Sequence, residues 1–147
     1  MSIIESIRNY LLTCPYLKEL SDVNVDFLPD DPTTYSIEQT PTEPIIKTYL
    51  DGSSDRQFTF VFACRMFYSD ERMNNITNSG FFENFQDWLY DNSENDILPQ
   101  LDEGMTAERI EAISSGYLYD ISGDLCNARY QIQCRLLYTK GGSIGVK

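Results

Sequence analysis

Two long runs of alternating residues limit what this chain can fold into more than any other feature of its sequence. Residues 57–68 read QFTFVFACRMFY and residues 128–138 read ARYQIQCRLLY. In the second run one face carries the apolar set Tyr130, Ile132, Cys134, Leu136 and Tyr138, and the other carries Arg129, Gln131, Gln133 and Arg135. A period of two is the pattern of a strand with one buried face. The runs therefore predict a large β-sheet with one buried face.

The first of these runs has little charge on either face. Phe58, Phe60, Phe62, Cys64 and Met66 would share one face, and the opposite face carries Thr59, Val61 and Ala63. A strand that is uncharged on both sides is normally central, or it is covered by a second layer or a partner. We therefore expect residues 57–68 to lie in the interior of the sheet.

Two segments have the apolar spacing of helices. Ser2 and Glu5 form the pattern of a capping box ahead of an apolar stripe, and Pro15 predicts that this helix ends near Thr13. Residues 69–92 form the main helical region. Its apolar stripe fits the buried face of an amphipathic helix and comprises Phe81, Phe82, Phe85, Trp88 and Leu89. Ser79 and Gly80 predict either a kink there or a break into two helices.

Shorter alternating segments fill the rest of the chain. They begin at Val23, Tyr35 and Pro44, and residues 109–121 are predicted to form a long antiparallel hairpin with residues 128–138. This order predicts one α+β domain over residues 1–140, with a mostly antiparallel sheet of about four to six strands and helices packed on one face. The Gly-rich residues 141–147 predict a flexible C-terminal tail.

The charge of the chain narrows its possible partners. Among 147 residues there are 23 acidic and 11 basic side chains, which gives a formal net charge of −12. The basic residues are spread along the chain, so the charge argues against sequence-specific nucleic-acid binding and against anionic membranes. No apolar stretch is long enough to span a bilayer. An acidic wall that DNA slides past, or a mimic of DNA, remains compatible with this composition.

The sequence lacks the residue patterns of the commonest nucleophilic and zinc-dependent catalytic sites. The chain has no histidine, which excludes Ser-His-Asp and Cys-His arrangements and the usual His-containing zinc sites. Its four cysteines form no CxxC pair, so a thiolate metal site is not indicated. We expect no catalytic, cofactor or metal site, and we expect the cysteines to serve as small apolar residues in a reducing cytoplasm.

Several stretches together resemble a family of phage proteins. They are IESIRNYLLTCPYL (4–17), YSIEQTPTEPIIKTYLDGSSDRQFTFVFACR (35–65), NSGFFENFQDWL (78–89) and EAISSGYLYDISGDLCNARYQIQCRLLY (111–138). This set is similar to the minor capsid proteins of tailed phages and prophages of Gram-positive bacteria. The resemblance covers roughly residues 3–138 and implies a tail terminator or head–tail joining protein. It carries over no functional residue.

The resemblance implies a structural role rather than an enzyme. Tail terminators assemble into a ring, usually a hexamer, that caps the tail tube and docks the head connector. The implied partners are other copies of the chain, the tail tube protein and the head connector protein. The implied location is the head–tail junction of the virion, after synthesis in the bacterial cytoplasm. We expect the face with Arg129, Gln131, Gln133 and Arg135, or the loops beside it, to lie near a subunit or tube contact.

Three other functions remain open at this stage. A neighbouring connector or head-completion protein would share the size and a similar fold. An acidic DNA mimic that inhibits a host nucleic-acid enzyme would fit the net charge of −12. A small enzyme built on carboxylates would need a deep pocket with strongly perturbed acids.

Overall fold

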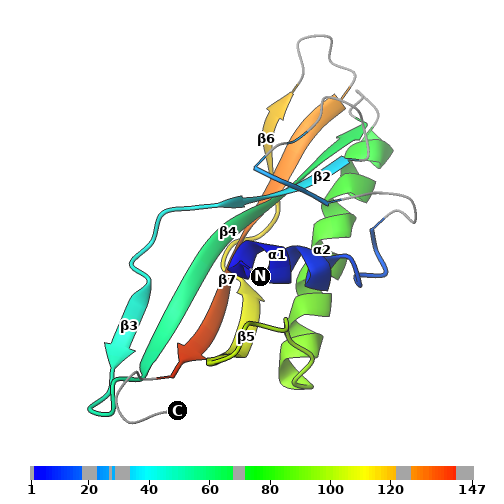
Figure 1. Ribbon diagram of the computed structural model, residues 1–147. Helices are drawn as coiled ribbons and strands as arrows, with labels where there is room; N and C mark the ends of the chain where they lie inside the picture. The colour runs from blue at the N-terminus through cyan, green and yellow to red at the C-terminus, as the bar shows by residue number, and fades with distance from the viewer. Residues whose placement is uncertain are drawn as a thin grey trace.

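The protein forms two helices and seven strands in the part of the chain that the structure describes. A computed structural model describes residues 2–17, 23–26, 28, 34–67, 72–121 and 127–141 (Figure 1). The elements follow in the order α1 (Ile3–Leu11), β1 (Val23–Val25), β2 (Thr34–Gln39), β3 (Ile45–Thr48), β4 (Ser54–Phe67), α2 (Arg72–Glu94), β5 (Met105–Ala112), β6 (Tyr117–Ile121) and β7 (Asn127–Lys140). The α+β class and the mostly antiparallel sheet are confirmed.

Two strands of 14 residues, β4 and β7, form the centre of the sheet. They pair antiparallel along their whole length, from Ser54 opposite Lys140 to Phe67 opposite Asn127. At about 3.3 Å per residue the pair extends over roughly 45 Å. These are the two runs that the sequence singles out, and the central position of β4 explains why it carries little charge on either face.

The sheet has seven strands rather than the expected four to six. Each central strand is long enough to pair with two shorter strands along its outer edge. Strands β2 and β3 lie end to end along β4, and β5 and β6 lie end to end along β7. The predicted hairpin partner over residues 109–121 is therefore two strands, interrupted at residues 113–116. Strand β1 adds a parallel pairing with β2.

Both helices belong to the same apolar core as one face of the sheet. Phe85 of α2 stacks on Phe62 of β4 with ring centroids 4.6 Å apart. Tyr10 of α1 lies against Trp88 of α2, and its hydroxyl donates to the carbonyl of Ile97 at 2.8 Å. The buried core runs from the apolar side of α1 to alternate residues of β7. Figure 1 shows both helices on one side of the long central strands.

The helix boundaries follow the sequence signals, with one exception. The Oγ atom of Ser2 accepts a hydrogen bond from the backbone N–H of Glu5 at 3.3 Å, as the capping pattern predicts. Helix α2 runs without interruption through Ser79 and Gly80, so the possible break into two helices does not occur. Of the predicted tail, Gly141 alone lies within the described residues, and its N–H donates to the carbonyl of Gly104 at 2.7 Å.

Two glycines allow a test of how α2 packs against the sheet. A Cβ atom added at Gly116, between β5 and β6, would lie 2.4 Å from the Cβ and Cγ atoms of Phe82, whereas one added at Gly80 would meet nothing within 4 Å. We expect Gly116→Ala to lower the free energy of unfolding by about 1–3 kcal/mol because α2 must shift. We expect Gly80→Ala to raise it by about 0.5–1 kcal/mol through helix propensity. Urea denaturation of both variants measures this, and changes of the same sign would contradict the packing.

Candidate functional site

The four residues predicted to lie near a contact share one face of β7. We call this face, which bears Arg129, Gln131, Gln133 and Arg135, the open face. The alternate residues of β7 from Tyr130 to Tyr138 are buried in the core on the opposite side, so the predicted division of the strand into two faces is confirmed. Whether the open face meets another molecule stays a prediction.

Arg129 links three strands across the open face. Its Nη2 atom binds Oε1 of Glu38 on β2 at 2.9 Å, and its Nε atom donates to Oε1 of Gln131 at 3.0 Å. Its guanidinium also lies over the ring of Tyr119 of β6, 5.1 Å from the ring centroid. The Arg129 side chain is only 17% exposed. It is therefore held in one position by groups on both sides of it.

Gln131 and Gln133 share one hydroxyl group. The amide nitrogen of Gln131 donates to the hydroxyl of Tyr117 at 2.6 Å, and that of Gln133 reaches the same oxygen at 3.4 Å. Gln131 is 6% exposed, although it lies on the side of β7 opposite the core that holds both described helices. Its register partner on β4 is Ala63, which is fully buried. A small residue there leaves room for the glutamine to lie flat over the sheet with its polar groups satisfied.

Arg135 belongs to an ion network that passes around the β5 edge of the sheet. Its guanidinium binds Glu111 of β5, with an Nε to Oε2 distance of 3.1 Å. Arg109 binds the other oxygen of Glu111 at 3.1 Å, and it also binds Glu94 of α2 at 2.8 Å. The network therefore connects the open face to the helical side of the molecule.

These contacts change which residues of the open face are available to a partner. Both arginines are engaged within the chain and Gln131 is buried, so Gln133 is the exposed member of the predicted set. The exposed apolar side chains beside Gln133 and Arg129 on this face are Ile113, whose N–H donates to the carbonyl of Gln133, and Tyr119, which lies against Arg129. The sequence contained the signal for Tyr119, because residues 117–121 alternate as YLYDI, but the place of this strand beside β7 depends on a register that the sequence does not state.

The described thiols are poorly suited to catalysis. Cys14, Cys64 and Cys134 are buried and form no disulfide. Burial raises the pKa of each thiol above its ordinary value, so each stays protonated at neutral pH. Within the described ranges no three His, Cys, Asp or Glu side chains gather closely enough to hold a metal ion. None of the described helices has the length and apolar character needed to cross a membrane.

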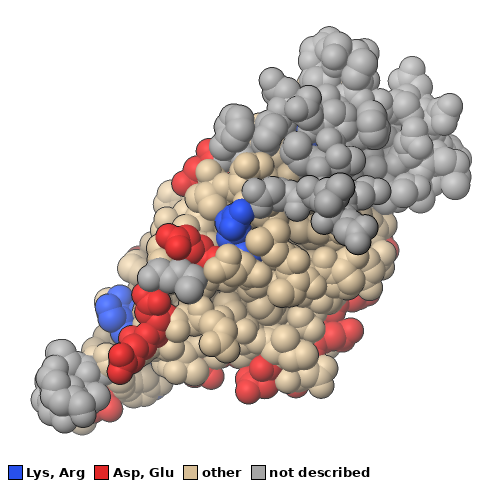
Figure 2. All heavy atoms as spheres, turned by 45° about the vertical axis from the view of Figure 1, so that its right-hand side comes forward, with Lys and Arg blue, Asp and Glu red and all other residues tan. Residues whose placement is uncertain are grey.

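Acidic side chains are exposed along α2. In Figure 2 acidic side chains lie along the left side and the lower rim of the molecule, and basic side chains are few in this view. The exposed acids of the helix follow helical spacing and are Glu83, Asp87, Asp91 and Glu94. They are accounted for by a solvated helix face, since Phe82, Phe85 and Leu89 are buried on the other side.

Neither the scan against protein-family models nor the search of curated proteins finds a match to this chain.

The ion pair between Arg129 and Glu38 is testable by a double-mutant cycle. Because both side chains are partly buried, at 17% and 29% exposed, we expect a coupling energy of about 1 kcal/mol from Arg129→Met and Glu38→Gln. The more exposed pair of Arg109 and Glu94 is the control, with an expected coupling below about 0.5 kcal/mol. Urea unfolding of the single and double variants provides the values. A coupling near zero for the first pair would mean that the open face is not held as described.

Proposed function

We propose that this protein is a structural component of the phage head–tail junction, similar to a tail terminator. It forms a ring that caps the tail tube and docks the head connector. The resemblance to phage minor capsid proteins supplies the setting. The observation that carries the proposal is the open face, where a long sheet holds its polar side chains in fixed positions on the side opposite the two described helices.

Fixed side chains suit a surface that binds another protein. Ordering long side chains on binding costs about 0.5–1.5 kcal/mol for each one, and Arg129 and Arg135 are already ordered by their ion pairs. Arginine and tyrosine are also enriched at the centres of protein interfaces. Tyr119, 62% exposed and stacked on Arg129, combines both residue types at one position.

The charge of the chain fits a ring through which DNA passes. With a net charge of −12 per copy, rotation about one axis would give a strongly negative assembly. Such a wall repels the phosphate backbone, so DNA would pass without binding. The ring needs no chemistry of its own, and the partners are other copies of the chain, the tail tube protein and the head connector protein.

A DNA mimic is the second candidate, and the acidic row on α2 is the observation that favours it. From Glu83 to Glu94 the row spans about 16 Å, at 1.5 Å per residue, or roughly one charge every 5 Å. Duplex DNA carries one charge about every 1.7 Å. Arg109 also neutralises Glu94. The row is therefore too sparse to imitate the phosphates of a duplex, and this candidate stands behind the structural role.

Deletion of the gene from its parent phage or prophage tests the proposed function. We expect overlong tail tubes and unjoined heads in electron micrographs of the lysate, because nothing would stop tube growth. Tails of normal length beside heads without DNA would indicate a connector or head-completion protein instead. Normal infectious particles would contradict the structural role and favour an inhibitor, which a DNA-competition binding assay would then examine.

A single-atom change on the open face tests where the contact lies. Gln133→Glu puts a negative charge on the exposed member of the predicted set, and Gln86→Glu puts the same charge on the wet side of α2. If the open face is a contact, the first variant should restore infectivity to the deletion phage at least tenfold less well than the second. Equal complementation by two stably folded variants would remove the open face from the interface.

A further inference from the structure

In the described part of the chain the sheet ends at four outer strands, and β5 is the longest of them. The outer strands β1, β3 and β6 have three, four and five residues, whereas β5 has eight. An outer strand presents unpaired backbone N–H and C=O groups on its free side, and a long one is the better template for another chain. Among the described strands, the edge of β5 therefore carries the greatest hazard of pairing with a second copy.

A side chain of α2 occupies the backbone of this edge. The hydroxyl of Ser93 donates to the carbonyl of Ile110 at 2.7 Å and accepts from the N–H of the same residue at 3.1 Å. Backbone groups of successive residues point alternately to the two sides of a strand, so Ile110 directs both of its groups away from β7 and toward the helix. One hydroxyl thus takes both positions that a neighbouring strand would use.

The side chain of Arg109 crosses from the same edge to α2. Its Nη1 atom binds Oε2 of Glu94 at 2.8 Å, and its guanidinium lies 5.3 Å from the ring centroid of Tyr90. Ser93 and Glu94 are adjacent at the end of α2, so the helix holds two consecutive residues of β5. We call Ser93 and Glu94, with their contacts to Ile110 and Arg109, the latch.

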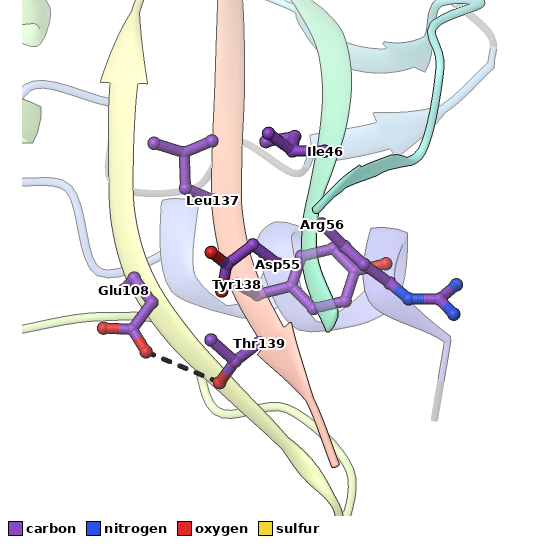
Figure 3. Close-up of a pocket in the computed structure, with 7 residues that line it drawn as sticks. All are labelled: Ile46, Asp55, Arg56, Glu108, Leu137, Tyr138 and Thr139. Carbon is purple, nitrogen blue, oxygen red and sulfur yellow. Dashed lines mark hydrogen bonds between the residues drawn. The ribbon is translucent and has the colours of Figure 1, made fainter. Parts of the chain in front are cut away.

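The start of β5 is irregular and lies outside the latch. Figure 3 shows β5 beside β7, where Thr139 donates to Glu108 at 3.4 Å. Glu108 lines a hollow of about 330 Å³ whose lining does not include Ile110. The register of β5 with β7 shifts between Ala107 and Arg109, and a bulge of this kind makes an edge a poorer template. The regular part of the strand, residues 109–112, is therefore the part that the latch closes.

We propose that the end of α2 is a latch that keeps the β5 edge from pairing with β5 of a second copy. The charges of β5 match those of the same strand in a second copy. In an antiparallel pair centred on Ile110, Arg109 of each copy lies opposite Glu111 of the other. Opposite charges at facing positions stabilise such a pair. The two Ile110 residues would exchange with each other the backbone hydrogen bonds that Ser93 now makes.

The latch also bears on how copies meet in the proposed ring. A pair of β5 strands is isologous, since the same strand serves both copies, so it closes at two copies. A ring of more copies, built by rotation about one axis, needs contacts between two different surfaces. The latch would therefore remove a contact that competes with ring assembly. That consequence rests on the proposed function, whereas the closing of the edge does not, and purified protein is enough to test it.

The first test removes the latch. Ser93→Ala combined with Glu94→Gln deletes the hydroxyl and the charge that hold β5. We expect this variant to self-associate at least tenfold more strongly than the unaltered protein in analytical ultracentrifugation, because the edge is then free to pair. Gln86→Ala combined with Asp87→Asn is the matched control, since it makes the same change of charge at exposed positions of the same helix. Equal association of the two variants would overturn the inference.

The second test distinguishes strand pairing from the association of partly unfolded chains. In the variant without the latch, adding Arg109→Glu gives β5 two acids at the facing positions, and adding Glu111→Arg instead gives it two bases. Each of these chains alone should stay monomeric, because like charges would face each other. An equal mixture should form a one-to-one pair, measured by native mass spectrometry with one chain tagged. Association of either chain alone to the same extent as the mixture would overturn the pairing of β5 with β5.

Discussion

The rest of the structure depends on the antiparallel pairing of β4 with β7. Its 14 residue pairs give the sheet two long outer edges, and each edge accommodates two short strands. The same pairing sets Phe60 and Phe62 beside Cys134 and Ile132 on one face, where the helices cover them. At one end β4 and β7 continue past the helices, and there β3 pairs with β4 in an exposed hairpin.

The two faces of the sheet are closed by different means. Helices cover the apolar face. On the open face the fully buried Ala63 and Ser36 are shielded by long polar side chains, among them Gln131 and Arg129, which satisfy one another or Tyr117 and Glu38. A polar layer of this kind stays ordered while it faces water. That property makes the face suitable for a protein partner and gives the proposed junction role its physical basis.

Local patterns predicted the local features. The cap at Ser2, the buried stripe of α2 and the two faces of β7 all follow from spacing within a few residues. Spacing could not give the number of strands, because two short strands on one edge look the same in sequence as one long strand with a turn. Nor could it show that Arg129 is paired, since Glu38 lies 91 residues away along the chain.

The sequence by itself determined which side chains share a face, because a period of two or of 3.6 is a property of the backbone alone. Tertiary structure decided which of those side chains are available. Arg135 is engaged because β5 brings Glu111 beside it, and Leu50 is exposed because its hairpin extends past the helices that cover the rest of the sheet. Strand pairing and the packing of helices over the sheet bring together segments that lie far apart in the chain. The spacing of residues within one segment therefore cannot predict them.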